Sequence, residues 1–277
     1  MEKYKLDSWV LELLADPLTK KQAGKADFKK RGKDNLLDAR IFLKNTPGFK
    51  IWEEGQIEYE QWEQGSNFYK NQVENYKKEI KYDSPVYEKF PISGKVLDVG
   101  GGAGMLREFM VDGSKLVSVD PFLDPVGAAP ESRKEAYSCF KEPLNFIIAN
   151  AEFIPFIDNS FDIVHMRSML DHVQGPDLTI MEARRVLKKD GFLLIGMTVE
   201  GGENGKLSFE DNLKEFIRLV LTFLGFKKYK DHHIMHPTFP SLVKILEDND
   251  FKIEEVYWQP YWKGKVVYIK AIQKRNL

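Results

Sequence analysis

The sequence predicts an α/β protein built on a mainly parallel β-sheet, with an antiparallel hairpin at its C-terminal end and a small N-terminal module. Two observations predict this fold class. From Lys95 onward, short apolar runs alternate with helix-like segments, which is typical of a parallel sheet covered by helices on both faces. The last two apolar runs are separated only by a short turn, so they have to pair antiparallel.

Five apolar runs after residue 94 have the length and composition of buried strands. They are residues 95–99, 115–119, 144–149, 161–166 and 192–199. Helix-like segments lie between them at residues 104–112, about 127–139 and 177–189. A helix over 239–249 follows, and the final strands, 251–258 and 265–272, are separated by Pro260 and Gly264.

The residues before the sheet divide into two parts. Residues 1–48 are expected to form the small N-terminal module, which ends at a turn signal, Asn45-Thr46-Pro47-Gly48. Residues 49–90 are rich in Trp, Tyr, Glu and Gln and predict one or two helices, with Ser84-Pro85 and Pro91 breaking the chain. The main domain then spans residues 91–277.

Composition excludes several classes of protein. A net charge of -1 offers no basic surface for a nucleic-acid backbone. The single cysteine, Cys139, cannot form an internal disulfide. The most apolar helical stretch, Phe216 to Phe226, contains Arg218 and falls short of the roughly 20 residues that a membrane span needs. A cytoplasmic location is expected, because the N-terminus lacks the apolar run of a signal peptide.

A glycine loop, Gly100-Gly101-Gly102-Ala103-Gly104, follows the first predicted strand of the main domain. Glycines at such a turn allow close approach of the backbone to a ligand. A dinucleotide fingerprint would need a glycine where this chain has Met105. Asp98 at the mouth of the loop would repel a pyrophosphate but suits a ligand with a cationic amine. S-adenosylmethionine carries such an ammonium group and a sulfonium.

The ends of the next two strands carry polar residues. Asp120, 22 residues after Asp98, is placed to accept hydrogen bonds from ribose hydroxyls. Asn150, Ala151 and Glu152 follow the third strand and offer an acceptor for an adenine amino group beside apolar side chains. His165 lies within the fourth strand and is expected to be a buried structural residue.

Residues 95–199 resemble the core of the class I S-adenosylmethionine-dependent methyltransferases, in the small-molecule, ubiquinone/menaquinone-type subgroup. Five segments carry the resemblance in order: VLDVGGGAG (96–104), VSVDP (117–121), NAEFIPF (150–156), SFDIVHMRSMLDHV (160–173) and ARRVLKKDGFLLI (183–195). The resemblance implies a Rossmann-like seven-stranded sheet, S-adenosylmethionine as methyl donor and S-adenosylhomocysteine as product. It also implies that residues 49–90 act as a linker that covers the cofactor.

The resemblance implies a role for each matching position. Asp98 would bind the methionine amine, the glycines would shape the loop, and Met166 and Arg167 would lie at the methionine end of the cofactor. The implied cofactor-binding set is Asp98, Gly100, Gly101, Gly102, Gly104, Asp120, Pro121, Phe122, Asn150, Ala151, Glu152, Met166 and Arg167.

A second resemblance covers the N-terminus. Residues 14–20, LADPLTK, resemble the L-x-C-P-x-C-K start of the zinc-ribbon-like activator protein of tRNA and release-factor methyltransferases. The two cysteines are replaced by Asp16 and Thr19, so no structural zinc is expected. The resemblance implies an activator-like module fused to its enzyme and covering an apolar face; an unrelated helical extension is the alternative.

Histidines are the candidate catalytic residues, because a base is needed where the nucleophile must lose a proton. His172 follows the fourth strand, at the rim where α/β sites lie. His232 and His233 follow an insertion, residues 200–236, that is expected to form a lid with an amphipathic helix over 208–224. His232 and His236 are four residues apart, but Pro237 argues against the helix that a metal site there would need, so no metal is predicted.

These observations predict a methyltransferase that acts on an O or C nucleophile of a small molecule. An apolar lid would suit an apolar acceptor, lipid-linked or sugar-linked. Two alternatives stay open: an RNA or protein methyltransferase, which the activator-like N-terminus favours, and a non-catalytic S-adenosylmethionine-binding protein. The near-zero charge and the absence of an N/D-P-P-Y/F run after the fourth strand argue against the first of these.

Overall fold

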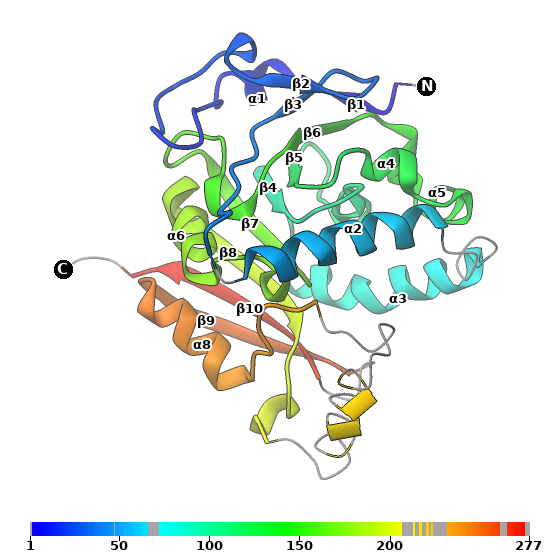
Figure 1. Cartoon of the computed structure of the whole chain (residues 1–277), viewed down its shortest axis with the longest axis vertical. Coiled ribbons are helices and arrows are strands. Elements are labelled where there is room, and N and C mark those ends of the chain that lie inside the picture. Colours follow the sequence, from blue (N-terminus) through cyan, green and yellow to red (C-terminus); the bar gives the residue numbers. More distant parts are fainter. Residues whose placement is uncertain are drawn as a thin grey trace.

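The computed structural model describes residues 2–46, 48–65, 72–206, 232–260 and 265–274, together with positions 213, 216, 217, 220, 221 and 223. One large sheet runs through the molecule, and helices lie on both of its faces (Figure 1). Its strands are β1 Tyr4–Lys5, β2 Lys29–Arg31, β3 Leu36–Asp38, β4 Lys95–Val99, β5 Lys115–Asp120, β6 Leu144–Ile148, β7 Phe161–Arg167, β8 Leu187–Thr198, β9 Phe251–Gln259 and β10 Val266–Gln273.

The strand order is β2-β3-β6-β5-β4-β7-β8-β10-β9, with β1 paired to β6 beside this path. Strands β6, β5, β4, β7 and β8 are mutually parallel, while β10 is antiparallel to both β8 and β9. The predicted fold class is therefore confirmed: the strands from β4 to β10 form a seven-stranded, mainly parallel sheet that ends in an antiparallel hairpin. Because parallel strands end at one edge, the loops after β4, β5, β6 and β7 meet there.

Side chains along β4 point alternately to the two faces of the sheet, and each face is covered by one apolar layer of the core. Leu97 and Val99 point into one layer, and Val96 points into the other. The first layer is covered by α1, α6 and α8, and the second by α3, α4 and the 3-10 turn at Met105–Phe109. The helices are α1 Ser8–Leu11, α2 Phe49–Gly65, α3 Val73–Lys89, α4 Pro125–Ala128, α5 Glu131–Ala136, α6 Pro176–Val186 and α8 Phe239–Asp248.

The N-terminal residues extend the sheet. β3 pairs in parallel with the end of β6, and β2 forms a hairpin with β3 along that edge. Residues 2–46 lie over this side of the sheet in Figure 1. Leu14 forms a bridge to Phe156 and is fully buried in the first apolar layer, so this segment does cover an apolar face of the main domain.

Asp16 closes one turn in this segment. Oδ1 of Asp16 accepts the backbone N–H groups of Leu18 at 3.1 Å and Thr19 at 2.7 Å. These hydrogen bonds lower the pKa of Asp16, because they favour its ionised form. The carboxylate therefore closes the turn in which the resembling family has its first cysteine.

Two sequence predictions about helix ends are wrong. Ser84-Pro85 does not break the chain: Pro85 lies inside α3, and the helix continues because Val86 and Tyr87 on its last turn are buried against the sheet. The helix predicted over 177–189 ends at Val186, since Leu187 already pairs with Phe161 as the first residue of β8. Tertiary packing overrides local propensity at both places.

The predicted amphipathic helix over 208–224 falls largely outside the described residues. No helix in the described part of the chain is long and apolar enough to cross a membrane.

Candidate functional site

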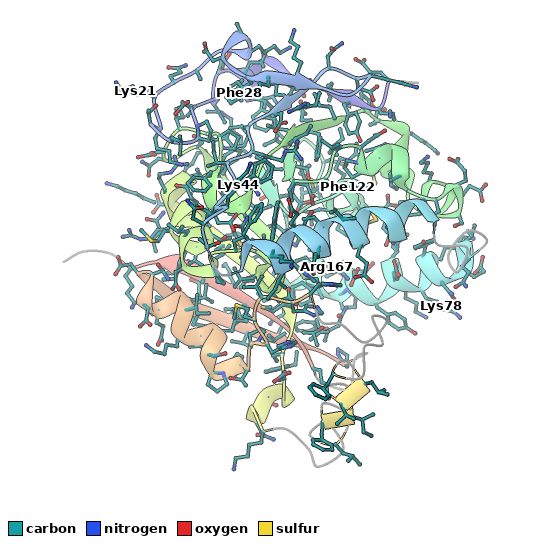
Figure 2. All side chains as sticks on the ribbon, in the orientation of Figure 1. Lys21, Phe28, Lys44, Lys78, Phe122 and Arg167 are labelled. Atoms are coloured by element: carbon teal, nitrogen blue, oxygen red, sulfur yellow. The ribbon has the colours of Figure 1, made fainter. Side chains whose placement is uncertain are left out.

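A cavity of about 990 Å³ lies where the ends of β4, β5, β6 and β7 meet. Helices α2 and α3 form its other wall, with Trp52 and Tyr87 among the lining residues. Phe122 and Arg167, which also line it, lie near the centre of the molecule beside α2 (Figure 2). Most predicted site residues line this one cavity: Asp98, Gly100, Gly101, Gly102, Asp120, Pro121, Phe122, Asn150, Ala151, Glu152, Arg167, His172, His232 and His233.

The glycine loop turns sharply at the floor of the cavity. Gly100 and Gly102 have φ of 67° and 48°, in the left-handed region that favours glycine. A Cβ on Gly101 would lie 2.3 Å from Oδ2 of Asp98 and 2.4 Å from Oγ of Ser118, so a side chain is excluded there. Around Gly102 the corresponding space is empty to 4 Å. The loop thus exposes backbone to the cavity.

Asp98 is the centre of a buried hydrogen-bonded group. Its Oδ1 lies 2.7 Å from Nδ1 of His165, which is its register partner on β7. Nε2 of the same imidazole lies 3.2 Å from the hydroxyl of Tyr87 on α3. Burial raises the pKa of Tyr87 well above its usual value, so this hydroxyl stays protonated. His165 therefore orients the carboxylate of Asp98 at the mouth of the loop.

The ends of β5 and β6 supply the next polar groups. Asp120 accepts the backbone N–H of Gly102 at 3.1 Å and that of Phe122 at 2.9 Å, which fixes the carboxylate against the loop. Asn150 is 2% exposed, and its Oδ1 accepts no hydrogen bond from any described residue. A buried acceptor without a donor is costly, so this oxygen is suited to a ligand N–H.

Glu152 is held by backbone amides. It accepts the N–H groups of Gln174 at 2.7 Å and Gly175 at 3.1 Å, and it is 3% exposed. Burial raises the pKa of its carboxyl, although these hydrogen bonds act in the opposite direction. Glu152 therefore ties the loop after β6 to the segment before α6.

Two predicted residues, Met166 and Gly104, lie outside the lining of the cavity, and a third, Arg167, lines it while pairing with a helix. Met166 does not line the cavity: it is fully buried in the first apolar layer, because strand alternation turns it away from the site. Gly104 does not line it either, since a Cβ there would meet Leu144 at 2.5 Å. Arg167 lines the cavity, but its guanidinium already forms a bidentate pair with Asp83 of α3, at 2.6 and 2.9 Å.

Histidines gather at the rim of the cavity. The rings of His172 and His233 have centroids 4.5 Å apart, and His236 lies 5.5 Å from His233. His232 points to α2, where its Nδ1 lies 2.5 Å from Oε2 of Glu58. The fold thus brings the turn after β7, which carries His172, close to the segment before α8, which carries His232 and His233.

Several lining residues were not predicted. Trp52, Glu58, Asp83 and Tyr87 come from α2 and α3, which carry no motif. His165 was expected to be a structural residue, yet it lines the cavity. Its position opposite Asp98 in the pairing of β4 with β7 is the signal that could have identified it.

The donor set fits S-adenosylmethionine. The unpartnered Oδ1 of Asn150 offers an acceptor, Asp98 and Asp120 offer carboxylates, and the space above Gly102 leaves room for close approach of a ligand.

Comparison with known proteins agrees with this geometry. The methyltransferase domain family matches residues 97–195. The ubiquinone/menaquinone biosynthesis C-methyltransferase of Rhizobium rhizogenes is 37% identical over 109 residues, 37% of this chain and 41% of that protein. An uncharacterized protein of Methanocaldococcus jannaschii is 26% identical over 196 residues, 70% of this chain and 78% of that protein. The chain thus spans only about two fifths of the quinone-pathway relative.

A solved structure shares the fold. The 1,6-didemethyltoxoflavin-N1-methyltransferase of Burkholderia thailandensis, bound to its substrate and S-adenosylhomocysteine, has a TM-score of 0.53 and 13% identity over 89% of this chain and all of that one.

Residues 97–195 therefore form a methyltransferase domain. The matched family, the strand order and the loop geometry together confirm the predicted enzyme class and the predicted methyl donor, S-adenosylmethionine.

Proposed function

We propose that this methyltransferase transfers a methyl group to an oxygen or carbon nucleophile of a small molecule. The observation that carries the proposal is the single cavity that joins the donor residues at the strand ends to the histidines at the rim. At about 990 Å³ it lies at the upper end of the usual size of ligand pockets, roughly 300–1,000 Å³, so it has room for the donor and a second small molecule.

The donor side of the cavity takes the roles implied by the family. Asp98, held by His165, binds the methionine ammonium, and Asp120 binds the ribose hydroxyls. Asn150 and Glu152 lie at the adenine end, with Phe122 against the ring. The donor supplies an activated methyl on sulfonium, and the protein contributes by holding this methyl in line with the acceptor atom.

The acceptor side is the rim formed by His172, His232 and His233. Two of these side chains are partly exposed, with 44% of His172 and 42% of His233 accessible, so an acceptor can reach them. Imidazoles are suited to take a proton from a hydroxyl near neutral pH. The resembling quinone-pathway enzyme is a C-methyltransferase, which favours a phenol-like acceptor methylated at O or at an adjacent carbon.

The N-terminal residues take the role of a built-in activator. Residues 1–48 form this module in the proposal, residues 49–90 the cofactor cover, and residues 91–277 the catalytic domain with a lid over 200–236. The contacts of Leu14 and Lys20 support it, because Lys20 donates to Oε2 of Glu182 on α6 at 2.7 Å. The module stabilises the apolar face that a separate activator would otherwise cover.

The test uses the full chain in two steps. Calorimetry with S-adenosylmethionine and S-adenosylhomocysteine should show micromolar binding of both. Release of S-adenosylhomocysteine is then followed with a panel of catechols, hydroquinones, lipid-linked phenols, sugars, tRNA and a peptide. Turnover with one of the small phenolic or sugar acceptors supports the proposal, whereas turnover with tRNA or peptide alone overturns it.

A further inference from the structure

We propose that Asp171, His172 and His233 bind a divalent first-row metal ion, of the Zn²⁺ type, at the acceptor rim of the cavity. The site differs from the expectation of no metal, which considered only His232 and His236. The chemistry of the ligand set supports it, because two imidazoles and a carboxylate are a common ligand set for catalytic zinc and related ions.

The three side chains converge on a small volume. One ligand atom from each lies within 4.8 Å of the others. Nε2 of His233 lies 3.7 Å from Oδ2 of Asp171, and Nε2 of His172 lies 4.0 Å from Oδ1 of the same carboxylate. Atoms bound to a tetrahedral ion at about 2.0–2.1 Å lie roughly 3.4 Å apart, so separations of up to 4.8 Å would have to close to about that distance to complete the site.

The carboxylate of Asp171 is the most informative of the three groups. Its side chain is 18% exposed, and its Oδ1 is buried without accepting a hydrogen bond from any described residue. A buried carboxylate oxygen that lacks a donor is costly unless a cation or proton neutralises it. The imidazoles of His172 and His233 lie 4.0 and 3.7 Å from the two oxygens of this carboxylate, beyond hydrogen-bonding distance.

The backbone holds these ligands in place. Asp171 and His172 lie on one 3-10 turn, Leu170–His172, which directly follows β7. The carbonyl of Asp171 accepts the N–H of Ile234 at 2.7 Å, which ties the segment carrying His233 to that turn. Two ligands that are distant in sequence are thus held together by main-chain geometry, and His236 supports the cluster through its contact with Glu200 at 3.5 Å.

A metal at this point would activate the acceptor, and this role rests on the proposed function. Three protein ligands leave a coordination position open toward the cavity, as in catalytic zinc sites. An acceptor hydroxyl bound there has its pKa lowered and releases its proton to solvent. The resulting oxyanion, or the carbon next to it in a phenolate, then forms the bond to the methyl group while the methyl–sulfur bond breaks. His172 and His233 would act as ligands in this arrangement, not as bases.

The test measures metal affinity directly on the full chain. Metal-free protein is titrated with Zn²⁺ in competition with a chromophoric chelator, and with Co²⁺ to record the visible spectrum of the bound ion. Wild type should bind Zn²⁺ with a Kd below about 1 μM. Asp171→Asn, His172→Ala and His233→Ala should each weaken binding by about 100-fold or more and should change the Co²⁺ spectrum.

His232→Ala is the matched control, because His232 neighbours His233 in sequence but pairs with Glu58. Its Zn²⁺ affinity should equal that of wild type. Wild-type binding weaker than about 10 μM, or equal loss in the control, would overturn the proposal. The affinity for S-adenosylmethionine is measured on the same samples, because a variant that still binds the donor is folded. If the wild type bound Zn²⁺ but not S-adenosylmethionine, the proposed methyltransferase function would be overturned and the proposed metal site would not.

Discussion

The donor half and the acceptor half of the cavity are built in different ways. In the donor half, Asp98 and Asp120 lie on the ends of neighbouring strands, and each carboxylate is fixed by a hydrogen bond to the glycine loop or to an adjacent strand. The acceptor half is assembled from α2, the turn after β7 and the segment before α8. The strands hold the first half to one geometry, whereas the second depends on contacts between distant segments.

This difference indicates that the acceptor side of the cavity can vary while the donor side keeps its geometry. Residues in the donor half cannot move without disturbing the sheet, because their backbone forms strand ladders. The rim residues are joined by single contacts between distant segments, such as the pair of His232 with Glu58 and the backbone hydrogen bond from Ile234 to Asp171. Variants in the donor half should therefore abolish donor binding, and variants at the rim should change turnover while leaving donor affinity intact.

The largest effect is expected from Gly101→Ala. The new Cβ would overlap Oδ2 of Asp98 and Oγ of Ser118, so the loop has to shift. Displacement of this kind should weaken S-adenosylmethionine binding by about 100-fold, measured by calorimetry. Gly24→Ala is the control, because a Cβ there would meet Asp27 only at 3.7 Å. Wild-type affinity in Gly101→Ala would show that the loop does not contact the donor.

Asp98→Asn should have the next largest effect. The substitution keeps the shape of the side chain but removes the charge that is proposed to face the methionine ammonium. Loss of one charge-assisted hydrogen bond, about 1.5–3 kcal/mol, corresponds to about 10- to 100-fold weaker donor binding. Thermal unfolding checks that the pair with His165 still forms. An unchanged affinity would mean that Asp98 serves the fold alone.

A smaller effect, confined to turnover, is expected at the rim. His232→Ala should reduce turnover of the acceptor by about 10-fold, less than the 10²–10⁴-fold that acid–base groups typically contribute, and should leave donor affinity within error. Glu58→Gln removes the same ion pair but keeps the imidazole. If the two variants lose turnover equally, His232 acts through its pairing with α2 and not through contact with the acceptor.

The difference between the two halves of the cavity also explains which site residues could be predicted from the sequence. Asp98, Asp120 and Asn150 were predictable because each follows an apolar strand run, and parallel strands end at one edge. Tyr87 and Asp83 were not, since their helix precedes the sheet and its place over the site is decided by packing. Pro85 suggested a break in this same helix, although burial of Val86 holds it together.

The N-terminal segment is a second region whose structure could not be predicted from the sequence. The sequence did not show that β3 would extend the main sheet. A three-residue strand carries little pattern by itself, and its pairing with Ile148 depends on a neighbour that lies more than a hundred residues away. Short elements of this kind are specified by tertiary contacts.

The smallest effect is expected from Glu152→Gln and concerns stability. Burial raises the pKa of this carboxyl above its usual 4.5, so the folded protein retains a proton that the unfolded chain releases. The stability of the wild type therefore falls as the pH rises from about 4.5 through the folded-state pKa. Glutamine does not titrate and its amide oxygen can still accept the N–H groups of Gln174 and Gly175.

The free energy of unfolding of Glu152→Gln relative to wild type should accordingly increase as the pH rises from about 4.5 through the folded-state pKa of Glu152, by an amount within the usual 0.5–3 kcal/mol range of point substitutions. Urea titrations at three pH values without donor provide the measurement.

Asp162→Asn is the matched variant with the opposite shift. Burial acts to raise the pKa of Asp162, but hydrogen bonds from Lys188 and Lys95 outweigh burial and lower the pKa. Its substitution should cost stability at neutral pH and little in acid. If the stability of the two variants relative to wild type changed with pH in the same direction, burial would not raise the pKa of Glu152 in the folded protein.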